Sequence, residues 1–87
     1  MPAYTFHADP GHGWLAVPCV ELTALRIAGR ISAYSYMCQG IAYLEEDCDA
    51  AVFVEAYKQA NGCEPAISYT HTNSDSRIRR YARFAGV

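Results

Sequence analysis

Residues 4–9 alternate aromatic and polar side chains, and residues 13–17 contain three large apolar ones. A period of two is typical of a strand with one face buried. The residues between these stretches include a proline and glycines, which supply the backbone angles of a tight turn. The pattern therefore predicts a β-hairpin at the start of the chain.

A short helix is predicted directly after this hairpin. Pro18 suits the first helical turn, because its missing N–H has no partner there in any case. Leu22, Leu25 and Ala28 then recur at helical spacing. We expect Gly29 to end this helix.

A second hairpin is predicted from two further stretches rich in β-forming residues. Residues 31–37 would place Tyr34 and Tyr36 on one face of a strand, and residues 41–45 would return as its partner. The intervening residues 38–40 include a glycine and supply the turn.

A longer helix is expected next, with Asp47 or Asp49 as its N-terminal cap. Asn61 and Gly62 form a helix stop. The apolar stripe that indicates this helix consists of Val52, Phe53, Ala56, Tyr57 and Ala60.

Residues 66–72 alternate again and predict a fifth strand, after which the chain closes on a basic segment, 77–87. We expect this segment to be a basic tail or a sheet edge. The order ββαββαβ predicts one α+β domain over residues 1–87. Its architecture would be a two-layer sandwich, with a mostly antiparallel sheet of about five strands covered on one face by two helices.

Composition narrows the class of protein. The 87 residues are 52% hydrophobic and 18% charged, which argues against disorder. No apolar run approaches the ~18 residues that a bilayer span requires. The start of the chain lacks the cationic and apolar stretches of a secretory signal, so we expect a cytoplasmic protein with four reduced cysteines and no membrane partner.

One candidate metal site is the spacing of His7, Asp9 and His12, with His71 as a fourth group. Imidazole and carboxylate are usual ligands of zinc and non-haem iron. The competing interpretation is that Asp9 accepts hydrogen bonds from the backbone of its own turn, as residues before Pro-Gly often do.

The basic segment offers a second candidate, a nucleic-acid site in which arginines contact phosphates and aromatic rings stack on bases. Its arginines are Arg77, Arg79, Arg80 and Arg83. A formal net charge of −2 makes the chain a poor general binder of nucleic acid, so this remains the less favoured alternative.

A third candidate is a surface that contacts another protein. Tyrosine gives a large contact area at low entropic cost, and a carboxylate cluster can pair with a partner's arginines. The tyrosines expected on strands are Tyr34, Tyr36, Tyr43 and Tyr69, and the acidic residues after them are Glu45, Glu46 and Asp47.

Catalysis finds little support in the sequence. Cys48 lies near a predicted helix start, which lowers a thiol pKa, but the flanking Asp47 and Asp49 raise it. No phosphate-binding glycine loop or nucleophile turn is present. We expect no catalytic residue and no cofactor, and therefore a protein that is not an enzyme.

Three stretches carry a resemblance to a known group of proteins. They read YTFHADPGHGWL at 4–15, ISAYSY at 31–36 and YLEEDCDA at 43–50. The chain resembles small uncharacterised proteins carried by bacteriophages and plasmids. The resemblance implies a bacterial cytoplasm and a mobile genetic element, where small accessory proteins often inhibit host defence, as anti-CRISPR proteins do. The expected function is a non-enzymatic, stoichiometric inhibitor that binds a host bacterial protein or protein complex.

Overall fold

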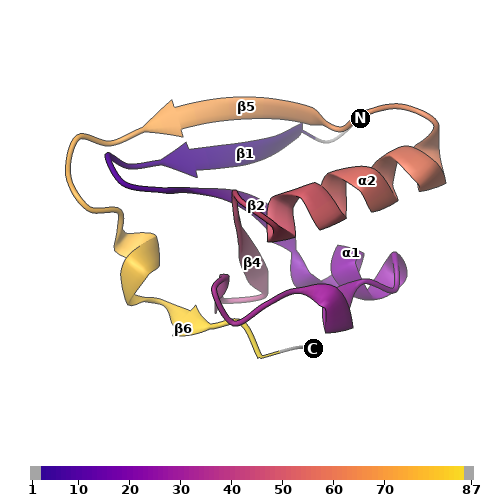
Figure 1. Ribbon diagram of the computed structural model, residues 1–87, viewed down its shortest axis with the longest axis horizontal. Coiled ribbons are helices and arrows are strands. Elements are labelled where there is room, and N and C mark those ends of the chain that lie inside the picture. Colours follow the sequence, from indigo (N-terminus) through magenta and orange to yellow (C-terminus); the bar gives the residue numbers. More distant parts are fainter. Residues whose placement is uncertain (1–2, 86–87) are drawn as a thin grey trace.

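The structure is a computed structural model that describes residues 3–85 as a six-stranded sheet with α-helices packed against one face (Figure 1). The strands lie in the order β5-β1-β2-β4-β3-β6. The elements, in chain order, are β1 (Ala3–Ala8), β2 (Gly13–Pro18), α1 (Cys19–Ala24), the 3-10 helix η1 (Ala28–Arg30), β3 (Tyr36–Cys38), β4 (Ile41–Glu45), α2 (Asp49–Asn61), β5 (Ala66–His71), the 3-10 helix η2 (Arg77–Arg80) and β6 (Ala82–Arg83). The predicted α+β class is confirmed.

The sheet differs from the prediction in its strand count and in one pairing. It has six strands rather than about five, because Ala82 of β6 pairs with Met37 of β3. The strands β1 and β5 are parallel, with Ala3 beside Ala66, whereas the other neighbouring pairs are antiparallel. The parallel pair arises because α2 carries the chain back along the sheet between β4 and β5.

The core lies between the sheet and both α-helices. Leu15 of β2 and Leu44 of β4 are paired across the sheet and are 1% and 0% exposed. They belong to the same buried cluster as Leu22 of α1 and Phe53 of α2. Both helices therefore cover one face, and the residues that alternate with Leu15 and Leu44 point to the opposite face.

The two helices end differently from one another. α1 stops at Ala24 rather than at Gly29, because Arg26 adopts a left-handed φ of 60° that interrupts the helix. α2 ends at Gly62 as predicted, with a φ of 75° and its N–H bonded to the carbonyl of Lys58 at 2.8 Å. No helix among residues 3–85 is long and apolar enough to cross a membrane.

The expected strand over residues 31–37 is mostly absent. Only Tyr36–Cys38 form β3, while residues 31–35 are turn and irregular backbone, so Tyr34 does not lie on a strand. The backbone of residues 31–35 does not pair with β4. The polar side chains of this stretch form hydrogen bonds with another element, which are described below.

The basic segment folds back on the sheet. Ile78 of η2 and the following Phe84 are 3% and 4% exposed, so residues 77–85 are anchored at two points. Ala82–Arg83 form the edge strand β6, and residues 86–87 lie outside the described part of the chain. The arginines of this segment are therefore held on the protein surface by the apolar residues between them.

Candidate functional site

The sheet face without α-helices carries a row of aromatic side chains. Trp14 pairs with both His7 and Glu45 in the sheet register, and Tyr36 pairs with Tyr43, so these residues share one face. The ring centroids of Trp14 and Tyr36 lie 6.2 Å apart, and those of His7 and Tyr43 lie 6.0 Å apart. This aromatic row therefore covers the sheet face that no α-helix shields from solvent.

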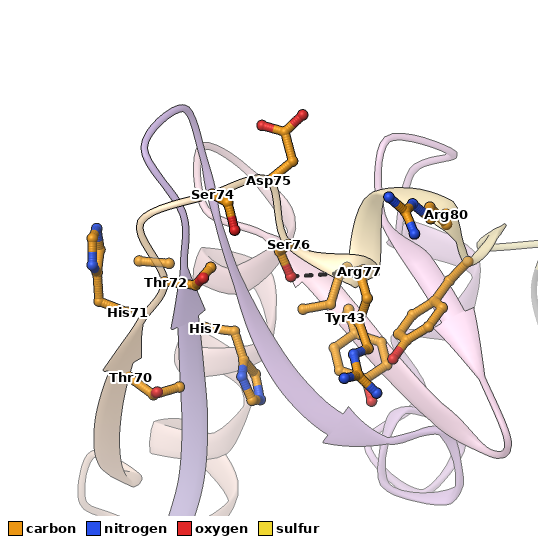
Figure 2. Close-up of a pocket in the computed structure, with 13 residues that line it drawn as sticks. His7, Tyr43, Thr70, His71, Thr72, Ser74, Asp75, Ser76, Arg77 and Arg80 are labelled. Atoms are coloured by element: carbon orange, nitrogen blue, oxygen red, sulfur yellow. Dashed lines mark hydrogen bonds between the residues drawn. The ribbon is translucent and has the colours of Figure 1, made fainter.

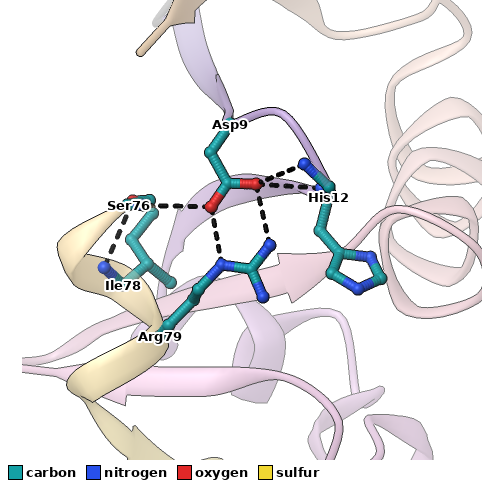
Figure 3. A network of polar contacts seen from close by, with 6 residues as sticks. Asp9, His12, Ser76, Ile78 and Arg79 are labelled. Atoms are coloured by element: carbon teal, nitrogen blue, oxygen red, sulfur yellow. Dashed lines mark hydrogen bonds and ion pairs between the residues drawn. The ribbon is translucent and has the colours of Figure 1, made fainter. Parts of the chain in front are cut away.

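The 3-10 helix η2 is fixed on this face by an ion pair. Both carboxylate oxygens of Asp9 accept hydrogen bonds from the Arg79 guanidinium, at 2.6 and 2.9 Å (Figure 3). Asp9 also accepts from the backbone N–H groups of Gly11, His12 and Ser76, at 3.0, 2.9 and 2.9 Å. The Arg79 guanidinium is the main reason that the pKa of the Asp9 carboxyl lies far below its usual range.

The structure does not bring the residues of the candidate metal site together. Asp9 uses its oxygens for Arg79 and for its own turn, which confirms the competing interpretation of this residue. His7 and His71 point in different directions in Figure 2. Among residues 3–85, no three His, Cys, Asp or Glu side chains converge as metal ligands would.

A groove lies on one side of η2, with a volume of about 580 Å³. We call it the aromatic groove, and it is lined by His12, Trp14, Ser32, Tyr34, Tyr36, Glu45, Asp47, Cys48, Arg79 and Arg83. Two of its rings are already covered by cations. The Arg79 guanidinium lies 5.4 Å from the centre of the Trp14 ring, and that of Arg83 lies 5.0 Å from the centre of Tyr36. Tyr34 is 76% exposed at the edge of this groove.

Of the acidic residues Glu45, Glu46 and Asp47, the first has a structural role and the other two are exposed. The Glu45 carboxylate accepts hydrogen bonds from the backbone N–H groups of Asp47, Cys48 and Asp49, at 2.9, 2.6 and 3.2 Å. Glu45 therefore caps α2, which corrects the expectation that Asp47 or Asp49 would do so. Glu46 and Asp47 remain exposed, and Asp47 lines the aromatic groove.

Asp49 holds the turn that carries Tyr34. Its carboxylate accepts from the N–H and Oγ of Ser32, at 3.0 and 2.7 Å, and from the Oγ of Ser35, at 2.5 Å. Ser35 in turn accepts from the backbone N–H of Glu45 at 2.9 Å. Because Asp49 and Ser35 are buried, this network locks residues 32–35 against the start of α2 and determines where Tyr34 stands. No local motif indicates this contact.

We predict that Asp49→Ala lowers the free energy of unfolding by about 2–3 kcal/mol, because the buried hydroxyl of Ser35 and the half-buried donors of Ser32 lose their acceptor. Urea unfolding followed by circular dichroism measures the change. Asp47→Ala is the matched control, since this exposed acid is expected to change stability by less than about 0.5 kcal/mol. Equal stabilities of the two variants would contradict the role of Asp49.

A second hollow, of about 720 Å³, lies on the other side of η2 (Figure 2). We call it the polar hollow, and it is lined by His7, Ala8, Tyr43, Thr70, His71, Thr72, Ser74, Asp75, Ser76, Arg77, Ile78, Arg80 and Tyr81. The four tyrosines of the predicted contact surface are thus separated. Tyr34 and Tyr36 line the groove, Tyr43 lines the hollow, and Tyr69 lies on β5 against Phe6, with ring centroids 5.6 Å apart.

The arginines of the predicted nucleic-acid site are divided as well. Arg79 is paired with Asp9, and Arg83 stacks on Tyr36 and donates to the carbonyl of Ala33 at 3.2 Å. Arg77 and Arg80 line the polar hollow. The four cations therefore do not form the continuous basic track that a nucleic-acid backbone requires.

The fold and site define a small α+β protein in which the sheet face without α-helices is split into two hollows by the 3-10 helix η2. No family model matches the chain, and no solved structure matches it. The chain is 43% identical over 44 residues to a cytochrome P450 monooxygenase, ltmQ, of Epichloe festucae var. lolii. This similarity covers 46% of the chain and only 8% of that protein, so it defines no family.

Proposed function

We propose that this protein is a non-enzymatic binding module that engages one partner protein through the aromatic groove. The observation that carries the proposal is the exposed Tyr34 ring in a groove that Asp47 and further aromatic residues also line. Exposed tyrosines at the centre of a contact surface are frequent binding hot spots.

The aromatic rings of the groove suggest which side chain on the partner would bind there. Trp14 and Tyr36 each carry a guanidinium of this chain, whereas Tyr34 has none among the described residues. An arginine of the partner would repeat on Tyr34 the stacking that the chain already makes on the other two rings. Asp47 and the neighbouring Glu46 would pair with its charge. The favoured partner surface is therefore an exposed segment that carries arginine.

The biological setting of the proposal comes from the resemblance to phage and plasmid proteins. In that setting the partner is a component of a bacterial host defence system in the cytoplasm, and binding inhibits it stoichiometrically. A protein of 87 residues can supply the ~800 Å² per partner of an ordinary interface. Inhibition by coverage of a surface needs no catalytic group.

The test compares Tyr34→Ala with Tyr69→Ala, which removes a tyrosine of almost equal exposure, 75% against 76%, from a different surface. Tagged wild type and both variants are used to enrich partners from bacterial lysate, followed by quantitative mass spectrometry. We expect a partner that Tyr69→Ala retains fully and that Tyr34→Ala loses by about 30-fold, as loss of a hot spot near 2 kcal/mol implies.

The purified partner then allows a direct measurement of stoichiometry by analytical ultracentrifugation. A 1:1 complex that charge reversal by Asp47→Lys weakens would support the proposal. Partners that are retained equally by wild type and Tyr34→Ala, or lost through Tyr69→Ala, would refute the groove as the binding surface.

A further inference from the structure

The polar hollow has the volume of a small-molecule site and a lining that combines polar and aromatic side chains. Its volume of about 720 Å³ falls within the ~300–1,000 Å³ of small-molecule sites. Side chains from three strands, the loop after β5 and η2 converge on it. Most of them are polar, and hydroxyl groups of Thr70, Thr72 and Ser74 lie along one side (Figure 2).

The aromatic part of the hollow is a wall of three rings. Tyr43 lies between His7 and Tyr81, at centroid distances of 6.0 and 5.1 Å. Burial lowers the pKa of His7, which favours the neutral imidazole, and burial also raises the pKa of the Tyr43 phenol. The wall therefore presents uncharged rings with hydrogen-bond donors, onto which a flat ligand ring can stack.

The charged part of the hollow is positive where it meets this wall. In Figure 2 the Arg77 side chain points in the direction of Tyr43, whereas Asp75, the only acidic side chain among the described residues that line the hollow, points away from it. Among the described residues, Asp9 and Arg79 form the ion pair of this face, and Arg77 takes part in none. An unpaired guanidinium in a hollow that also holds phenol and hydroxyl donors suits a tetrahedral anion, which accepts hydrogen bonds from several directions.

We infer that the polar hollow binds a small aromatic phosphate of mononucleotide size, with its phosphate on Arg77 and its ring against Tyr43 and His7. This inference is independent of the proposed partner groove, which lies on the other side of η2. A free small molecule is favoured over a nucleic acid, because the remaining arginines do not continue a track of positive charge from the hollow.

The experiment is calorimetric titration of the full chain with adenosine monophosphate, adenosine and inorganic phosphate. We expect the monophosphate to bind with a Kd below about 1 mM, and the other two compounds at least about tenfold more weakly. Arg77→Gln should weaken binding of the monophosphate by at least about tenfold. Arg30→Gln, which makes the same charge change at an exposed arginine of η1, is the matched control and should leave binding unchanged.

A second variant keeps the test independent of one side chain. Tyr43→Leu should weaken binding of the monophosphate but leave the weak binding of inorganic phosphate unchanged, while Tyr34→Ala in the other groove should alter neither. Absence of binding at 1 mM by the folded wild type would overturn the inference, as would equal binding by Arg77→Gln. Equal binding of adenosine would refute the phosphate contact, and equal binding of inorganic phosphate would refute the aromatic one. Much tighter binding of a 5′-phosphorylated oligonucleotide would replace the small molecule with a nucleic acid.

Discussion

Phe53→Ala is expected to lower the free energy of unfolding by about 3–5 kcal/mol, the usual cost of removing a fully buried aromatic side chain. Phe53 is 0% exposed and packs edge-on against Tyr4, with ring centroids 5.0 Å apart, and against Tyr57 at 5.9 Å. It is the side chain through which α2 closes the core over the sheet. A domain of this size has roughly 5–10 kcal/mol in total, so about half of its stability depends on this ring.

Urea unfolding followed by circular dichroism measures this loss, with Val20→Ala as the control. Val20 is an apolar residue of α1 that is 74% exposed, so its truncation is expected to change stability by less than about 0.5 kcal/mol. A Phe53→Ala variant within about 1 kcal/mol of wild type would show that α2 is not packed as described.

Asp9→Asn is expected to lower the melting temperature by about 10 °C or more at pH 7. The side chain of Asp9 is 0% exposed and is the acceptor for Arg79 and three backbone N–H groups. The neutral amide removes the ion pair and turns one acceptor oxygen into a donor that faces other donors. Because Asp9 joins the 9–13 turn to η2, the loss should also loosen the segment that separates the two hollows.

The same ion pair makes stability depend on pH in a defined direction. The folded pKa of Asp9 is lowered below its unfolded value of about 4, so its contribution is present above pH 4 and is lost as pH falls below that value. The difference in melting temperature between wild type and Asp9→Asn should therefore be constant near neutral pH and shrink between about pH 4 and pH 2. Asp75→Asn, at an exposed acid, is the control, and an equal difference at pH 7 and pH 2 would contradict this role of Asp9.

The predicted site shows where residue types are informative and where they are not. Tyrosine, arginine and acidic side chains were expected to form contacts, and the structure places several of them in two hollows on one face. Their division could not be foreseen, because it depends on how η2 crosses the sheet. Tyr81 was expected only as an aromatic ring interleaved with the arginines of the basic segment, and Trp14 was not among the expected site residues. The only signal for Trp14 was that large aromatic residues are frequent in this chain.

Local patterns were sufficient for the first hairpin, for α2 and for its stop at Gly62. Each of these is specified within a few residues, by a period of two, a helical stripe or a backbone angle that glycine adopts without strain. The sequence by itself therefore determined the class of the fold and most of its elements.

Tertiary structure decided the features that join distant parts of the chain. They include the parallel pairing of β1 with β5, the Asp9–Arg79 ion pair across 70 residues, and the network of Asp49 that replaces a strand with the turn of Tyr34. A periodic pattern reports which side of an element is apolar, but not which element covers it. Partners far apart in sequence are selected by packing and by satisfaction of buried polar groups, and these operate only once the whole chain has folded.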